Sequence, residues 1–185
     1  MKFLKFILIV FLGFSNALAF TKDSPKELLD YLPDEIGLFR ADKVLRIDKS
    51  VRRKYRHKDI RINVELYELP VSIKDGYDSK KIKEIKELHL KSARDTTMKI
   101  GYEGGKVMNL VGGGRVKFLF SRFLTTDYSR ILLDLYLTGI QGYVCKIWVT
   151  REGVISFRKE KRIEDAVRVI FSELMKPHLS GGASP

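Results

Sequence analysis

The sequence predicts an α+β domain in which a mostly antiparallel sheet of about six strands is flanked by helices. Strand-like segments follow one another along the chain and are joined by short turns that contain Gly or Asp. The two most apolar segments, residues 131–138 and 143–150, flank a turn with Gly139 and Gly142 and are typical of a β-hairpin. Helical patterns lie before, between and after the runs of strands. They do not alternate with single strands, so the pattern disfavours a parallel α/β sheet.

The N-terminal stretch "MKFLKFILIVFLGFSNALAF" is typical of a signal peptide. Lys2 and Lys5 precede an apolar run that is shorter than the roughly 20 residues needed to cross a bilayer. Ala17 and Ala19 then form the A-x-A pattern of a cleavage site. We therefore expect residues 1–19 to be removed and the protein to be exported, to a periplasm or as a secreted protein. An uncleaved membrane anchor is the alternative interpretation.

The mature chain is long enough for one domain, which we expect to cover residues 20–176. Residues 177–185, "PHLSGGASP", are expected to form a flexible tail. Cys145 is the only cysteine, so no internal disulfide stabilises the domain. In "GYVCKIWVT" it alternates with apolar residues on one strand face, and we expect an inert, buried thiol rather than a reactive one.

The first half of the domain begins with a short helix in "SPKELLDYLPDEIG". Ser24 is the expected N-cap, Pro25 occupies the first helical position and Pro33 ends the helix. An extended segment follows, and "VRRKYRHKDIRINVELYEL" then reads as two strands joined at residues 57–59. The second strand alternates apolar residues with Arg61, Asn63, Glu65 and Tyr67, which predicts one buried face and one face that is at least partly wet.

The second half begins with a helix in residues 78–99, whose narrow apolar stripe contains Ile82, Ile85, Leu88 and Ala93. Two strands are expected around the glycines at 112–114, and the hairpin described above should lie at the centre of the sheet. A last helix is predicted in residues 163–176, because Ile163, Val167, Ile170 and Leu174 recur at helical spacing.

Asp134 lies within the first hairpin strand, on the face opposite to its leucines. If a helix covers that face, Asp134 is a buried carboxylate that needs partners. If the face is open, Asp134 is an ordinary surface residue, and this is the interpretation that we favour.

Removal of Lys2 and Lys5 with the signal peptide lowers the formal net charge from +12 to +10. A surplus of this size favours anionic partners. The positive charge is concentrated in "KSVRRKYRHKDIR", which makes Arg52, Arg53, Lys54 and Arg56 the candidate anion-binding residues. A solvated hairpin without a ligand is the simpler interpretation. The expected export of the protein argues against nucleic acid as a partner.

No sequence motif indicates catalysis, a cofactor or a metal. "GYEGGKV" has three residues rather than four before its Gly-Lys pair, and Val107 replaces the Ser or Thr of a phosphate-binding loop. His57, His89 and His178 stand in no zinc-binding pattern, and no serine lies in a G-x-S-x-G motif. We therefore predict no catalytic, cofactor-binding or metal-binding residues, although an unrecognised hydrolase is retained as an alternative.

The segments "LPDEIGLFR", "IRINVELYELP", "GYEGGKV" and "LYLTGIQGYVCKIWVT" resemble small exported bacterial proteins of unassigned function. Their layout over residues 24–176 is similar to the Mog1/PsbP-type α/β/α sandwich. The resemblance implies a non-catalytic module that binds a partner, expected to be an envelope protein, or assists assembly. Tyr67, Tyr136 and Trp148 are the candidate contact aromatics, with core packing as their alternative role. Attachment to anionic lipid headgroups or a polyanion through the basic hairpin is the second hypothesis, and the sequence does not indicate the oligomeric state.

Overall fold

The computed structural model describes residues 23–94, 98–125, 131–153 and 156–176. The expected signal peptide (residues 1–19) and the expected tail (residues 177–185) lie outside these residues. Within them the chain forms three helices, α1 (Pro25–Asp30), α2 (Lys80–Arg94) and α3 (Phe157–Leu174), and nine strands. The strands are β1 (Glu35–Ile36), β2 (Phe39–Ala41), β3 (Leu45–Ile47), β4 (Ser50–His57), β5 (Ile60–Tyr67), β6 (Met98–Asn109), β7 (Arg115–Thr125), β8 (Leu132–Ile140) and β9 (Tyr143–Arg151).

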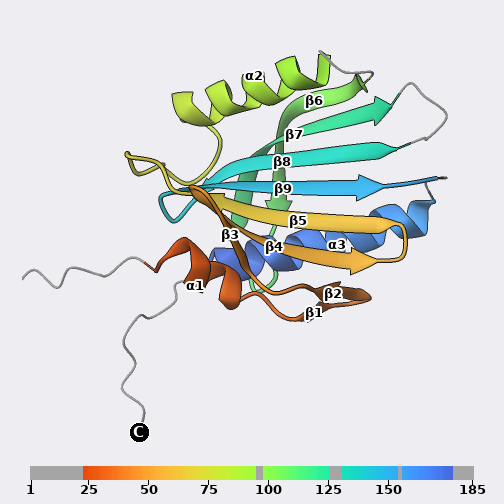
Figure 1. Cartoon of the computed structure of the whole chain (residues 1–185), viewed down its shortest axis with the longest axis horizontal. Coiled ribbons are helices and arrows are strands. Elements are labelled where there is room, and N and C mark those ends of the chain that lie inside the picture. The colour runs from red at the N-terminus through yellow and green to blue at the C-terminus, as the bar shows by residue number, and fades with distance from the viewer. Residues whose placement is uncertain (1–22, 95–97, 126–130, 154–155, 177–185) are drawn as a thin grey trace, which may run out of the picture. The chain divides into compact units, whose positions relative to one another are not determined.

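All nine strands join one antiparallel sheet, in the order β1-β2-β4-β5-β9-β8-β7-β6 (Figure 1). β3 lies off this path and pairs with the first half of β4, whereas β2 pairs with the second half of the same edge. The predicted α+β class is confirmed, and so is the central place of the β8–β9 hairpin. The sheet is larger than the predicted six strands because β1, β2 and β3 have only two or three residues each, too few to show a periodicity.

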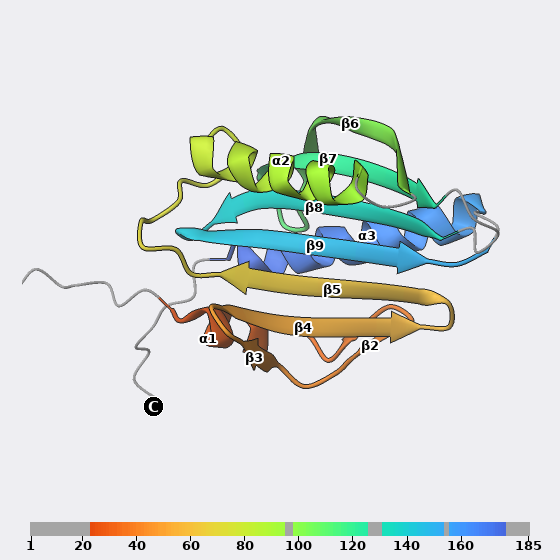
Figure 2. The same ribbon diagram turned by 45° about the horizontal axis from the view of Figure 1, so that its top comes forward.

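Helices pack on both faces of the sheet. Leu28 and Leu29 of α1 and Val167 and Phe171 of α3 are completely buried in the main core, together with apolar side chains from β4 to β9. α2 packs on the opposite face, where Ile82 and Leu90 contact two smaller apolar clusters on β7 to β9. In Figure 2, α2 lies in front of β7 and β8, and no helix lies over that side of β4 and β5.

The start of α1 agrees with the sequence. Ser24 Oγ accepts a hydrogen bond from the Glu27 N–H at 3.2 Å, and Glu27 Oε2 accepts one from the Ser24 N–H at 2.6 Å. This reciprocal capping box, with Pro25 directly after it, satisfies backbone donors that a helix start leaves free. The turn-rich segment that follows brings the chain into β1.

α2 and α3 differ in detail from the prediction. Leu88 of α2 is 67% exposed, and Leu90 takes the buried place that the prediction gave to Leu88. α3 begins at Phe157 rather than at 163, with Ser156 as its N-cap. The helix dipole disfavours basic residues in the first turns of a helix, and several stand there in α3. For this reason the sequence pattern did not indicate this part of the helix. Within the described parts of the chain, no helix is both long enough and apolar enough to cross a membrane.

Candidate functional site

The alternation of β4 divides the basic cluster between the two faces of the sheet. Arg53 points to the α1 side and is 5% exposed. Arg52, Lys54 and Arg56 point to the other side, which α2 leaves uncovered at β4 and β5. The structure therefore brings three of the four candidate anion-binding residues together and separates Arg53 from them.

Arg53 holds the end of α1. Its Nη1 donates to the carbonyl oxygens of Leu29 at 2.8 Å and Leu32 at 2.5 Å, and its Nη2 pairs with Asp34. The last carbonyls of a helix lack partners within the helix, and a cation there also matches the helix dipole. These contacts occupy both terminal nitrogens of the guanidinium group and give Arg53 a structural role.

Arginines line up across three strands on the uncovered side. Arg40 of β2 stands opposite Arg56 of β4, and Arg56 stands opposite Arg61 of β5. Directly opposed residues of antiparallel strands project to the same face. We call the side chains of Arg40, Arg52, Lys54, Arg56 and Arg61 the basic face.

Acidic neighbours neutralise only part of the basic face. Arg56 pairs with Asp42 at 2.7 Å and Arg40 with Glu35 at 3.2 Å, both in exposed pairs that contribute little. For Lys54 and Arg61, no side-chain hydrogen bond or ion pair joins them to any residue that the structure describes. These two cations are free for a ligand.

Glu65 of β5 lies between Arg52 of the basic face and strand β9 and forms ion pairs on both sides. It pairs with Arg52 at 2.8 Å and with Lys146 of β9 at 2.7 Å, and it accepts a hydrogen bond from the Tyr67 hydroxyl at 2.6 Å. Burial by itself would raise the pKa of Glu65, but the hydrogen bonds from Lys146, Tyr67 and Arg52 outweigh it and lower the pKa to about 2. Glu65 is therefore ionised at neutral pH and fixes Arg52 in place.

A shallow hollow of about 300 Å³ adjoins Arg52, and Trp148 forms part of its wall. The indole is partly buried, and the His89 ring of α2 contacts it edge-on with ring centroids 5.1 Å apart. Lys146 Nζ lies 5.2 Å from the indole centroid. Burial, with a smaller contribution from Lys146, lowers the pKa of His89 to about 4, so His89 is neutral at pH 7.

The three candidate contact aromatics do not form one surface. Tyr67 and Trp148 belong to the face that carries Arg52 and Glu65, and both are partly exposed. Tyr136 lies on the other side of the sheet, 7% exposed, in the main core beneath α3. Its ring packs against Phe118 and Phe120, with centroids 5.4 and 5.0 Å away.

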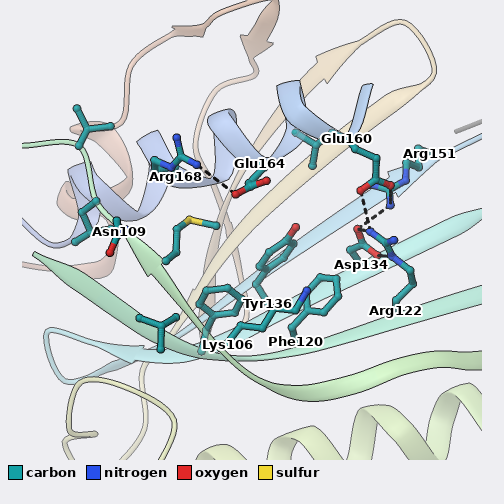
Figure 3. A pocket seen from close by; sticks show the side chains of 16 residues that line it. Lys106, Asn109, Phe120, Arg122, Asp134, Tyr136, Arg151, Glu160, Glu164 and Arg168 are labelled. Atoms are coloured by element: carbon teal, nitrogen blue, oxygen red, sulfur yellow. Dashed lines mark hydrogen bonds and ion pairs between the residues drawn. The ribbon is translucent and has the colours of Figure 1, made fainter. Parts of the chain in front are cut away.

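Asp134 is completely buried, so the surface interpretation was wrong and the alternative with a covering helix is correct. Arg122 of β7 and Arg151 of β9 both contact its carboxylate, and both also pair with Glu160 of α3 (Figure 3). α3 covers this face, which provides the low-dielectric setting and the fourth partner. The arrangement is an ion network that connects three strands to a helix.

Cys145 is completely buried, as predicted, and burial raises the pKa of its thiol far above the usual range. The "GYEGGKV" segment lies inside β6, so its glycines do not form a phosphate-binding loop. Among the residues that the structure describes, no three His, Cys, Asp or Glu side chains are close enough together to hold a metal ion.

The fold and the site together define an α+β domain with helices on both faces of its sheet and, on the α2 side, an uncovered and positively charged area at β4 and β5. No protein-family profile, curated protein or solved structure matches this chain. The functional argument therefore rests on the geometry of the chain itself.

Proposed function

We propose that this protein is a non-catalytic binding module that holds an acidic polymer on its basic face. The observation that carries the proposal is the row of Arg40, Arg56 and Arg61 across neighbouring strands, with Lys54 beside it and no acidic partner for Lys54 or Arg61 among the described residues. A polymer with repeated sulfate or carboxylate groups matches such a row.

The spacing of the row supports a linear ligand. Neighbouring strands lie about 4.8 Å apart, so three opposed arginines span roughly 10 Å. Like charges placed directly opposite each other on adjacent strands destabilise a sheet. An incoming chain of anions relieves this repulsion at Arg56 and Arg61, in addition to the attraction that it makes with each cation.

The position of Trp148 favours a polymer over a lipid bilayer as the ligand. Membrane-binding proteins insert protruding apolar side chains, whereas the Trp148 indole is partly buried between His89 and Lys146. A recessed ring beside Arg52 suits the apolar C–H face of a sugar in a bound chain. The expected export of the protein favours an acidic polysaccharide over nucleic acid.

The proposal also retains the Mog1/PsbP-type resemblance, which implies a non-catalytic accessory module. Its support here is the order of layers, with α1 and α3 on one side of an antiparallel sheet and α2 on the other. An envelope protein as the partner would have to present an acidic surface to the basic face.

The experiment uses heparin as a probe and the fluorescence of Trp148, the only tryptophan in the chain, as the readout. Heparin should change the Trp148 emission, and the affinity should fall steeply as salt is raised. A triple variant with Lys54, Arg56 and Arg61 changed to Gln should bind at least about tenfold more weakly. The matched control changes Arg158, Lys161 and Arg162 of α3 to Gln, which removes the same two arginines and one lysine from exposed positions on the helix that packs against the opposite face.

Equal loss in both triple variants would show that only net charge matters, and the proposal would fail. It would also fail if vesicles containing phosphatidylglycerol bound the protein through these residues while heparin did not. In that outcome the basic face would be a membrane-attachment surface.

A further inference from the structure

A separate cavity of about 650 Å³ lies between α3 and strands β6 to β8, on the side of the sheet opposite to the basic face (Figure 3). Its volume is within the usual range of small-molecule sites. Sixteen residues line it, and they supply both apolar and charged groups. The cavity plays no part in the polymer binding proposed above.

One wall of the cavity is aromatic. Phe118 and Phe120 each pack against the Tyr136 ring there, and Met108 of β6 adds a flexible apolar side chain. In Figure 3 the Tyr136 hydroxyl points from the sheet toward α3, into the space between them. No residue that the structure describes forms a hydrogen bond with this hydroxyl.

The carboxylates of the lining are all paired. Asp134 and Glu160 pair with Arg122 and Arg151, and Glu164 pairs with Arg168 at 3.2 Å. Lys106 is the remaining cation of the lining. Its Nζ lies 3.9 Å from the Phe120 ring centroid and 4.8 Å from that of Tyr102, and it makes no ion pair with a described residue.

We propose that this cavity binds a small amphipathic monocarboxylate, with the apolar body against Phe118, Tyr136 and Met108 and the carboxylate held by Lys106 Nζ and the Tyr136 hydroxyl. The one unmatched positive charge selects one negative charge, and the aromatic wall selects an apolar body. Burial raises the pKa of Tyr136 above its usual value, so the hydroxyl keeps its proton and donates it to the carboxylate in a hydrogen bond.

Decanoate is the probe, and the methyl resonances of methionine in the full chain are the readout. Decanoate should shift the Met108 methyl signal in a saturable way and leave that of Met98, at the far end of β6 on the α2 side, unchanged. Lys106→Met should weaken decanoate binding by about tenfold or more. Lys99→Met removes an exposed lysine from the same strand and should leave the affinity unchanged.

Two further measurements test which ligand charge the cavity selects and whether the ligand binds in this cavity. Decyltrimethylammonium has the same chain length and the opposite charge, and it should not shift the Met108 signal. Asn109→Trp adds a large side chain at an exposed position of the lining and should block decanoate. An unshifted Met108 signal, equal binding of the cationic probe, or an unchanged affinity in Lys106→Met would each overturn the inference.

Discussion

Arg122 and Asp134 form a two-point contact between adjacent strands, in which Arg122 Nε donates to Asp134 Oδ1 at 2.7 Å and Arg122 Nη2 donates to Oδ2 at 2.9 Å. The two residues stand directly opposite each other in the pairing of β7 with β8. Arg151 adds a second guanidinium group to the same carboxylate at 2.9 Å and is itself only 3% exposed. One buried acid therefore balances much of the charge of two arginines.

Asp134→Asn should destabilise the protein by about 3–5 kcal/mol, because it leaves buried positive charge without its main partner. The cost should be near the upper end of this range, since Arg151 Nε and Nη1 are buried and have no hydrogen-bond partner among the described residues. Urea unfolding measures the change in the free energy of unfolding. Asp165→Asn, which removes an exposed partner of Arg168, is the control and should change stability by no more than about 0.5 kcal/mol. Similar stabilities for the two variants would contradict this role of Asp134.

Arg53 and Arg61 should respond to substitution in opposite ways. Arg53→Met leaves the Leu32 carbonyl without its donor and the Leu29 carbonyl with only the longer hydrogen bond from the Leu32 N–H at 3.3 Å, and it should cost about 3 kcal/mol of stability. Its effect on heparin binding, measured under folding conditions, should be small because the guanidinium group does not belong to the basic face. Arg61→Met should weaken heparin binding and leave stability within about 0.5 kcal/mol. If both variants lost heparin affinity equally, the division of the cluster between two faces would be wrong.

His89 should make the stability depend on pH between about 6.5 and 4. Its folded pKa is about 4 against an ordinary value of 6.5, so in this interval the unfolded chain binds the proton and the folded chain does not. Stability should therefore decrease by about 2 kcal/mol as the pH falls through the interval. His89→Phe keeps a ring against Trp148 and should remove this part of the pH dependence. An NMR titration that placed the His89 pKa near 6.5 would contradict the effect of burial.

The fold class, the central hairpin, the start of α1 and the burial of Cys145 could be predicted because each depends on local pattern. Alternation along a strand and the residues of a helix cap are read directly from neighbours in the sequence. The same alternation placed Arg61, Asn63, Glu65 and Tyr67 together on one side of β5, which the structure bears out. That pattern was a local signal that Arg61 belongs to the basic face.

The remaining features depend on contacts between segments that are far apart in the sequence. Arg40 joins the basic face only through the pairing of the three-residue strand β2 with β4, a register that no local pattern specifies. Glu160 lies in the part of α3 that the helix prediction missed, so the sequence did not indicate that a helix covers Asp134 there, and Asp134 was expected at the surface. Lys106 gains its place only when β6, β7 and α3 enclose a cavity.

Glu65 should provide a second dependence on pH, at more acidic values than His89. Its pKa falls from 4.5 to about 2 on folding, so the stabilisation is complete above about pH 4.5 and is lost as the pH falls through about 2. Glu65→Gln should therefore cost about 3 kcal/mol at pH 7, and this cost should shrink toward zero as the pH falls through about 2, where the wild-type carboxyl also takes up a proton. Unfolding in urea at a series of pH values measures the difference, and Glu68→Gln, an exposed glutamate just after β5, is the control that should show no such trend. A cost of Glu65→Gln that stayed constant from pH 7 to pH 2 would mean that its ion pairs with Arg52 and Lys146 do not stabilise the fold.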